Sequence, residues 1–330
     1  DKLSQPLNSR LHRPATKCAI YNAIQIWYNC TMKKTKVTEI VHKPLADQVI
    51  ALMQGQVNNP KKRWDAPFNN LNSRPTNAKT KAHFKGVNAM LTTFDTYFNE
   101  YKYCLYATKK QWASLGNVPK PGAKPIPIVF YKPMFRDSKI IKDAKVISGC
   151  ILLYSKSFNL AQTEGDYTPP VFKTGKQYSV DAIDKFVKST KVDLRHKEQG
   201  RCFYNPIGDY INMTSKVNFK DTKEADATVH YYSTLFHELT HSTGHESRTG
   251  RIKKNSDKFG VRNEYAFEEL VAELGSVLFG QQFGIEKTIR DNHIQYLNSW
   301  IKALKHDYTL IGDALAQSQK AVDYFQPVKQ

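Results

Sequence analysis

Two histidines and a glutamate form the strongest chemical motif of the sequence. His237, Glu238 and His241 make an HExxH pattern at the end of a largely apolar stretch that begins near Tyr231. A spacing of four residues places both imidazoles on one face of a helix, where they can hold one Zn²⁺ ion. Glu238 would then accept a proton from a water molecule activated by the ion. A surface helix with two ordinary histidines is the alternative, but the apolar residues within and before the motif favour a buried helix.

A catalytic zinc ion needs a third protein ligand, and the residues directly after the motif are poor candidates for it. In the extended pattern HExxHxxGxxH the third ligand is a histidine, but this sequence has Ser247 at that position. His245 lies four residues beyond His241, but Gly244 is expected to end the helix before it. The third ligand is therefore expected to come from another element.

A pair of glutamates in the next predicted helix offers the missing ligand. Glu269 and Glu273 are four residues apart and share one face of the segment 264–274. A different face of the same helix is apolar and contains Phe267, Val271, Leu274 and Leu278. We predict that Glu269 is the ligand and that Glu273 accepts a hydrogen bond from a ligating histidine and so orients it. The reverse assignment, and two carboxylates that simply face solvent, are the alternatives.

The positive charge of the chain is concentrated in its first half. The 330 residues include 49 Lys and Arg against 30 Asp and Glu, which gives a formal net charge of +19. Residues 1–150 hold 25 basic and 8 acidic residues, a balance of +17, whereas residues 151–330 hold 24 and 22, a balance of +2. This division indicates a module that binds a polyanion, joined to a second module with another task. A solvated lysine-rich surface is the alternative.

Basic and aromatic residues alternate over residues 61–85, which include an irregular loop rich in Asn and Pro. Basic side chains neutralise phosphates and exposed aromatic rings stack on unpaired bases, so the pattern favours single-stranded DNA over a duplex. The sequence contains no helix-turn-helix, zinc-finger or basic-zipper pattern. The predicted DNA-binding residues are Lys61, Lys62, Arg63, Trp64, Phe68, Arg74, Lys79, Lys81, Phe84 and Lys85. The three aromatic residues of this set could instead anchor the loop in a core.

The length of the chain and its sequence breaks predict two domains. Paired prolines with glycines on either side predict a linker over residues 166–176. We therefore expect an N-terminal extension, a basic DNA-binding domain, the linker and a metal-binding domain. Their predicted bounds are 1–44, 45–165, 166–176 and 177–330.

Hydrophobic periodicity predicts an N-terminal domain with a small mixed sheet and helices. The expected helices cover residues 45–56, 86–99 and 109–115, and the expected strands cover 103–106, 126–131 and 146–157. The second half is expected to be mainly helical, because its motifs lie on helical segments. We therefore expect the α+β class, in which the small mixed domain precedes a mainly helical domain. The HExxH motif and the glutamate pair of that domain match the arrangement of a zincin-like metallopeptidase of the gluzincin type.

Composition also bounds where the protein is expected to act. No run approaches about 18 consecutive apolar residues, so we expect neither a membrane-spanning helix nor a membrane partner. The start of the chain lacks the charge and apolar pattern of a secretory signal. The five scattered cysteines form no CxxC pair, which favours a reducing compartment. We therefore expect a cytoplasmic protein.

Motifs from both halves together resemble the ArdC antirestriction family of conjugative plasmids and related mobile elements. In the first half the resemblance rests on WDAPF at 64–68 and FKGVN at 84–88. In the second half it rests on HELTH at 237–241 and EELVAE at 268–273. It covers about residues 45–326, and the residues before position 45 have no counterpart that we recognise.

The resemblance implies a TraC-primase-like domain that binds single strands, joined to a zincin-like metallopeptidase domain. It also implies that the protein protects incoming DNA from host restriction and passes with that DNA into a recipient cell. We therefore expect an antirestriction protein that binds single-stranded DNA, holds one Zn²⁺ ion and cleaves an unidentified protein.

Other functions are also compatible with the sequence. The main alternative is a DNA-binding protective protein whose metal site is structural or vestigial, or an accessory factor associated with a primase. A primase or nuclease is disfavoured, because the basic half offers no convincing carboxylate pair for two magnesium ions.

Overall fold

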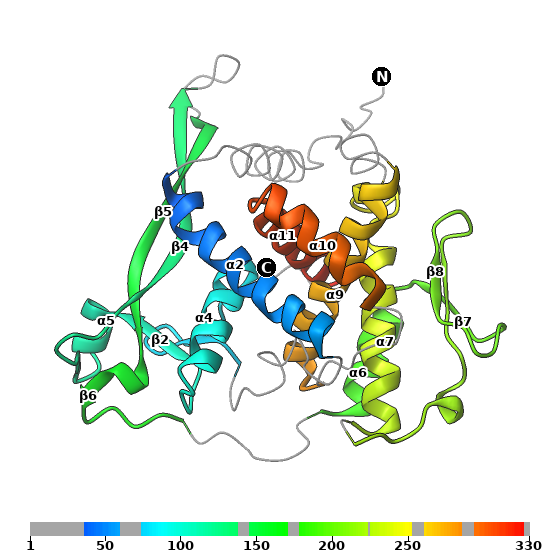
Figure 1. The fold of residues 1–330 in the computed structure, drawn as a ribbon, viewed down its shortest axis with the longest axis horizontal. Coiled ribbons are helices and arrows are strands. Elements are labelled where there is room, and N and C mark those ends of the chain that lie inside the picture. The colour runs from blue at the N-terminus through cyan, green and yellow to red at the C-terminus, as the bar shows by residue number, and fades with distance from the viewer. Residues whose placement is uncertain are drawn as a thin grey trace, which may run out of the picture. The chain divides into compact units, whose positions relative to one another are not determined.

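The structure of the protein is a computed structural model, shown in Figure 1. It describes residues 36–59, 74–137, 145–170, 178–223, 225–252, 261–285 and 294–326. Residues 130–153 fall in one compact unit, whereas residues 34–129 and 154–330 form a second, and each unit is considered by itself.

The described N-terminal residues combine helices with a four-stranded sheet. The helices are α2 (Lys36–Asn58), α4 (Gly86–Phe98) and α5 (Lys109–Ala113). The sheet contains β1 (Thr76–Asn77), β2 (Leu105–Thr108), β4 (Ile126–Asp137) and β5 (Lys145–Asn159), in the spatial order β1-β2-β5-β4. Strand β1 is parallel to β2, and β2 is antiparallel to β5. A second, two-stranded sheet joins β3 (Asn117–Pro119) to β6 (Thr163–Gly165), beside the 3-10 helix η1 (Leu160–Gln162).

The expected mixed domain is confirmed, with shifts at the ends of its elements. Helices α4 and α5 and strands β4 and β5 lie where the sequence predicts them. The helix expected over 45–56 is longer and begins at Lys36. In the extra turns Thr38, Val41 and His42 are buried, so these turns continue the buried face of Leu45 and Val49. The predicted end of the N-terminal extension, residue 44, therefore falls inside α2.

The C-terminal part is mainly helical, as expected for the α+β class. Its helices are α6 (Val180–Ser189), α7 (Ala227–Ser242), α9 (Val261–Phe283), α10 (Ile294–His306) and α11 (Leu310–Tyr324). A three-stranded sheet has the order β7-β9-β8, with β7 (Asp193–Arg195) parallel and β8 (Phe203–Asn205) antiparallel to β9 (Tyr210–Asn212). The 3-10 helix η2 (Lys216–Asn218) follows this sheet.

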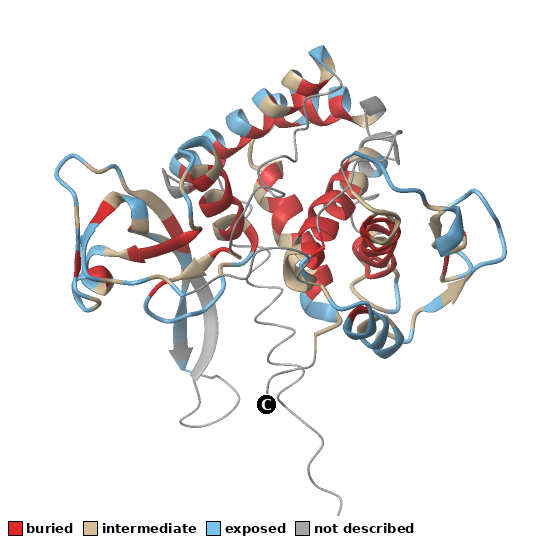
Figure 2. Ribbon diagram, turned by 90° about the horizontal axis from the view of Figure 1, so that it is seen from below, coloured by how far each residue is buried: buried red, intermediate tan, exposed pale blue. Residues whose placement is uncertain are grey.

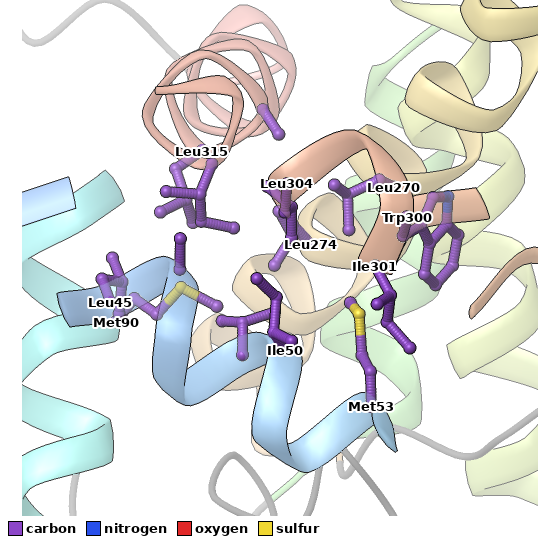
Figure 3. Close-up of a cluster of buried hydrophobic side chains, with 14 of the residues drawn as sticks. Leu45, Ile50, Met53, Met90, Leu270, Leu274, Trp300, Ile301, Leu304 and Leu315 are labelled. Carbon is purple, nitrogen blue, oxygen red and sulfur yellow. The ribbon is translucent and has the colours of Figure 1, made fainter. Parts of the chain in front are cut away.

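One hydrophobic cluster joins helices from both halves of the sequence. Figure 3 shows side chains of α2 meeting those of the C-terminal helices. The buried members are Leu45, Ala46, Val49, Ile50 and Met53 of α2, Met90 and Phe94 of α4, Phe267, Leu270, Val271 and Leu274 of α9, and residues of α10 and α11. The N-terminal helices therefore complete the core on which α9 lies.

A second hydrophobic cluster buries side chains of α7. Tyr232, Leu235, Phe236 and Leu239 of α7 are buried there together with Ile211 of β9. Helix α7 thus packs against the small sheet and against α9. Among the described residues, no helix is long and apolar enough to cross a membrane.

Candidate metal centre

Helix α7 holds the HExxH motif in the interior of the protein. Asp226 caps its first turn, because its side chain accepts a hydrogen bond from the backbone N–H of Val229. Apolar residues surround the motif on both sides, so the motif itself is buried: His237 is 1% exposed and Glu238 is 3% exposed. A buried imidazole or carboxylate needs a partner, which makes this part of α7 a functional candidate.

Helix α9 approaches α7 closely because a glycine lies at the contact. A Cβ atom on Gly275 would lie 2.4 Å from the Cγ2 atom of Thr240. A buried hydrogen bond of 2.9 Å from the Ser276 hydroxyl to the carbonyl of Ser233 adds a polar tie between the two helices. Close packing of this kind brings the carboxylates of α9 within reach of the imidazoles of α7.

Three side chains bring donor atoms together at this contact. The Nε2 atoms of His237 and His241 are 3.0 Å apart, and each is 3.5 Å from an oxygen of Glu269. Donor atoms about 2.0–2.1 Å from a tetrahedral ion lie about 3.3 Å from one another. Among the described residues, this is the one group of at least three His, Cys, Asp or Glu whose donor atoms all lie within 4.8 Å of one another. The donor set therefore fits a divalent ion.

A carboxylate lies behind each of the two histidines. The Nδ1 atom of His237 is 2.8 Å from Oε1 of Glu273, which is fully buried. The Nδ1 atom of His241 is 3.2 Å from Oε1 of Glu268. Such carboxylates hold an imidazole with its other nitrogen toward an ion. Glu273 was predicted from the sequence as a site residue, whereas Glu268 was not among the predicted site residues.

Arg251 completes the surroundings of His241 and was also not predicted. Its guanidinium donates to both oxygens of Glu268, at 2.6 and 2.9 Å, and it also bonds the Thr240 carbonyl and the Thr243 hydroxyl, each at 2.8 Å. Both charged side chains are buried. The sequence offered one sign that Glu268 has a role different from that of Glu269. The two residues are adjacent, and neighbours on a helix cannot face the same way.

The charges of the site depend on one another. Burial by itself lowers the pKa of His241, but bonds to Glu268 and Glu269 outweigh burial and raise this pKa to about 10. Burial by itself raises the pKa of Glu269, but the two histidines outweigh it and hold this pKa well below its usual range. Burial by itself also raises the pKa of Glu268, but Arg251 and His241 outweigh burial and hold this pKa below its usual value. Since a ligating imidazole must be deprotonated, a metal ion and a proton compete for His241.

The segment after the motif is tied to the small sheet. Arg248 donates to the Ser242 carbonyl at 2.6 Å and forms an ion pair with Asp209 in the turn between β8 and β9. His245 lies in this network, with its Nδ1 atom 2.8 Å from the Ser247 hydroxyl. The donor group found among the described residues consists of His237, His241 and Glu269 and does not include His245.

The predicted DNA-binding residues are only partly described. Lys61, Lys62, Arg63, Trp64 and Phe68 lie outside the described residues. The remaining members of the predicted set lie on or near the loop between β1 and α4. They are Arg74, Lys79, Lys81, Phe84 and Lys85.

These residues differ in how freely they could meet a nucleic acid. Lys79 is exposed, and Lys81 is exposed with its ammonium 3.0 Å from the Tyr167 hydroxyl. Lys85 forms an exposed ion pair of 2.8 Å with Asp323 of α11. Phe84 is half-buried and meets the ring of Tyr106 edge-on, with 6.5 Å between centroids. Arg74 is half-buried, and burial lowers the pKa of its guanidinium.

A buried HExxH helix with a glutamate from the following helix defines the class of zincin-like metallopeptidase domains. Residues 181–317 match the family model described as a zincin-like metallopeptidase. Residues 39–180 match the model described as the N-terminal domain of the anti-restriction factor ArdC. The chain therefore belongs to the ArdC antirestriction family.

Proteins of known name or structure resemble the chain along most of its length. It is 28% identical to the antirestriction ArdC protein from plasmid R388, solved metal-free and with Mn(II). These matches cover 87% of this chain and 96% and 97% of the others, with TM-scores of 0.67 and 0.66. An uncharacterized protein of Sinorhizobium fredii, y4eC, is 26% identical over 86% of this chain and 91% of its own length. The DNA primase TraC of Escherichia coli is 29% identical over 86% of this chain, but the match spans only 27% of TraC.

Proposed function

We propose that the protein is an antirestriction protein of a mobile element that binds single-stranded DNA and carries a metal-dependent peptidase centre. The observation that supports the peptidase centre best is the donor group of His237, His241 and Glu269, next to the buried Glu238. The DNA-binding half of the proposal rests on the charge of the first half of the chain, +17 over residues 1–150.

The three donors would hold one divalent ion, for which Zn²⁺ suits two imidazoles and a carboxylate. The related ArdC protein of plasmid R388 has been solved with Mn(II), which supports a divalent ion here as well. When bound, the ion supplies a Lewis acid that polarises the carbonyl of the scissile peptide bond.

The protein's own residues would carry the remaining steps. Glu238 would take the proton from the attacking water molecule and pass it to the leaving amine. Glu273 and Glu268 would keep the two imidazoles oriented toward the donor group. The substrate would be a protein near the bound DNA, because binding to DNA raises the local concentration of the peptidase there.

The peptidase proposal is tested by Glu238→Gln, which preserves shape and leaves the three donors in place. Unmodified DNA is introduced into a host that has a restriction enzyme and makes either the wild-type or the variant protein. The measurement is the fraction of recipient cells in which this DNA is established. We expect the variant to lose protection while its metal content and melting temperature stay at wild-type values. Full protection by the variant would favour the alternative function, a DNA-binding protein with a structural or vestigial metal site.

The DNA-binding proposal is tested by titrating the intact chain with an oligothymidylate, which forms no base pairs. Affinity is expected to fall steeply as the salt concentration rises, because basic side chains release counterions from the phosphates. The same protein should bind a duplex of equal length more weakly. Salt-independent affinity, or a preference for the duplex, would contradict the proposal.

A further inference from the structure

Several large apolar side chains on strands β4 and β5 are exposed. Phe130 is 46% exposed, Met134 42%, Phe135 56% and Ile151 44%, and all four fall within the compact unit of residues 130–153. None of them belongs to the DNA-binding set predicted from the sequence, which lies within residues 61–85. Clusters of exposed apolar side chains on a soluble protein mark binding surfaces.

Both faces of the end of β4 are open. Successive side chains of a strand point to opposite faces, so Phe130, Lys132 and Met134 share one face while Pro133 and Phe135 share the other. Four consecutive residues, 132–135, are nevertheless all exposed, as the colouring of β4 in Figure 2 illustrates. This part of the strand therefore covers no core on either face, and its aromatic side chains are available to a partner.

The charge of this segment indicates which kind of partner fits. Residues 130–153 contain five basic residues against two acidic ones, a balance of +3. Among the described side chains of the segment, Lys132 is exposed between Phe130 and Met134 on their shared face, and the acidic Asp137 is exposed two residues beyond Phe135. A cation between large apolar side chains suits a chain of phosphates that also carries planar bases. An acidic protein would match the charge but would not need open aromatic rings on both faces.

We infer that the segment 130–135 of β4 is a docking strip for single-stranded DNA. Strand β4 is the edge strand of its sheet, so one DNA strand passes around this edge. Phe130 stacks on a base on one face, Lys132 pairs with a phosphate on the same face, and Phe135 stacks on a base on the other face. The inference rests on the proposed DNA binding and assigns it to a surface that the sequence motifs did not reveal. Stacking of aromatic side chains on unpaired bases explains a preference for single-stranded DNA, because the bases of a duplex already stack on each other.

The test uses the full chain, an oligothymidylate and fluorescence anisotropy. Phe130→Ala and Phe135→Ala are each expected to weaken binding about fivefold or more, and the double variant more than either. Phe135→Trp should restore wild-type affinity, because a larger ring still stacks. Lys132→Gln should weaken binding and lower the slope of log affinity against log salt by about one.

Phe98→Ala provides a matched control. Phe98 is exposed to nearly the same extent, 47%, but its neighbours in sequence include the acidic Asp95 and Glu100. Its removal should leave DNA affinity within about twofold of wild type. A decrease equal to that of the strip variants would overturn the inference, since any exposed ring would then suffice.

The remaining outcomes separate the inference from the proposed function. If wild type binds the oligothymidylate and the strip variants bind equally well, the inference fails and the proposed DNA binding stands. If wild type does not bind, the proposed function itself fails. If Phe135→Ala changes the molecular mass measured by light scattering without DNA, the strip is an interface between protein copies, and the inference is also wrong.

Discussion

At the scale of single residues, the metal centre depends on groups that do not belong to the donor set. Each histidine directs Nε2 toward the donor group and lies with Nδ1 near a buried carboxylate, Glu273 for His237 and Glu268 for His241. An imidazole already held at Nδ1 loses little rotational freedom when an ion binds at Nε2. Changes at these carboxylates should therefore alter metal affinity without removing a donor.

The first prediction concerns Glu273→Gln. We expect metal binding about 10–100-fold weaker than wild type, because the amide is a poorer acceptor for the His237 N–H. A competition titration against a chelating dye measures the affinity. Glu198→Gln is the control, since the Glu198 carboxylate is outside the metal centre and makes an exposed contact of 3.8 Å with Arg201. A loss as complete as that of Glu269→Gln would instead identify Glu273 as a ligand and reverse the proposed roles.

The second prediction concerns Arg251→Met. The change leaves Glu268 as a buried carboxylate without its guanidinium, which should lower the free energy of unfolding by about 3–5 kcal/mol. Urea denaturation of the metal-free protein at neutral pH measures this loss. Arg201→Met, at an exposed arginine, should leave stability nearly unchanged. Equal stability of the two variants would show that the buried pair contributes nothing.

At the scale of elements, the distance between α7 and α9 is set by the smallest side chain at their contact. The third prediction is that Gly275→Ala separates the helices, because the new Cβ would meet Thr240 at 2.4 Å. We expect a loss of about 1–3 kcal/mol in stability and weaker metal binding. Adding Thr240→Ala should recover part of both, since it removes the two closest atoms.

A glycine in an open position is the control for that prediction. Nothing lies within 4 Å of the place that a Cβ on Gly55 of α2 would occupy, so Gly55→Ala should keep or raise stability. For the glycine variants and the double variant, urea denaturation measures stability and the dye competition measures metal affinity. Normal metal affinity in Gly275→Ala would show that the carboxylates of α9 tolerate a wider spacing.

The fourth prediction concerns the contact between α2 and α11. His42 of α2 is buried against Gly312, where a Cβ would lie 2.3 Å from the imidazole, and burial lowers the pKa of His42 to about 4. Between this value and the ordinary 6.5, the unfolded chain binds a proton that the folded protein does not, so stability falls as pH decreases through that window. The loss should approach about 3 kcal/mol near pH 4.

Variants separate this contribution from that of other groups. His42→Leu should remove it, so that stability declines less between pH 6.5 and pH 4, as measured by urea denaturation at each pH. His306→Gln is the control, because His306 is exposed and should keep the wild-type pH dependence. Identical curves for His42→Leu and wild type would contradict the prediction.

At the scale of the whole molecule, the metal-binding half is not expected to fold independently. Helices α2 and α4 contribute Leu45, Met53, Met90 and Phe94 to the cluster that also buries the apolar face of α9. Without these helices that face would meet water, at a cost of roughly 25 cal/mol for each Å² exposed. The members of this one cluster therefore lie on both sides of the predicted linker, residues 166–176.

The fifth prediction follows from this shared core. A fragment of residues 177–330 should show no cooperative urea transition and should bind metal far more weakly than the full chain. Mixing it with a fragment of residues 36–170 should restore both, because that fragment returns α2 and α4. A 177–330 fragment with full-chain metal affinity and cooperative unfolding would show that the shared core is dispensable.

Much of the fold was predictable because it depends on local patterns. Apolar spacing located α4, α5, β4 and β5, and the HExxH spacing placed two imidazoles on one face of α7. The length of α2 was underestimated, because its first turns are stabilised by packing against distant helices. Arg251 could not be recognised either, since nothing near it in the sequence distinguishes a buried arginine from a surface one.

The sequence by itself determined the α+β class, the family and the residues that can donate to a metal ion. These follow from residue type and from spacing within single helices, which neighbouring residues control. The tertiary structure alone decided that Glu268 and Arg251 stand behind His241, that Gly275 sets the spacing of α7 and α9, and that both halves share one core. Such contacts join residues far apart along the chain, and only the packing of whole elements brings them together.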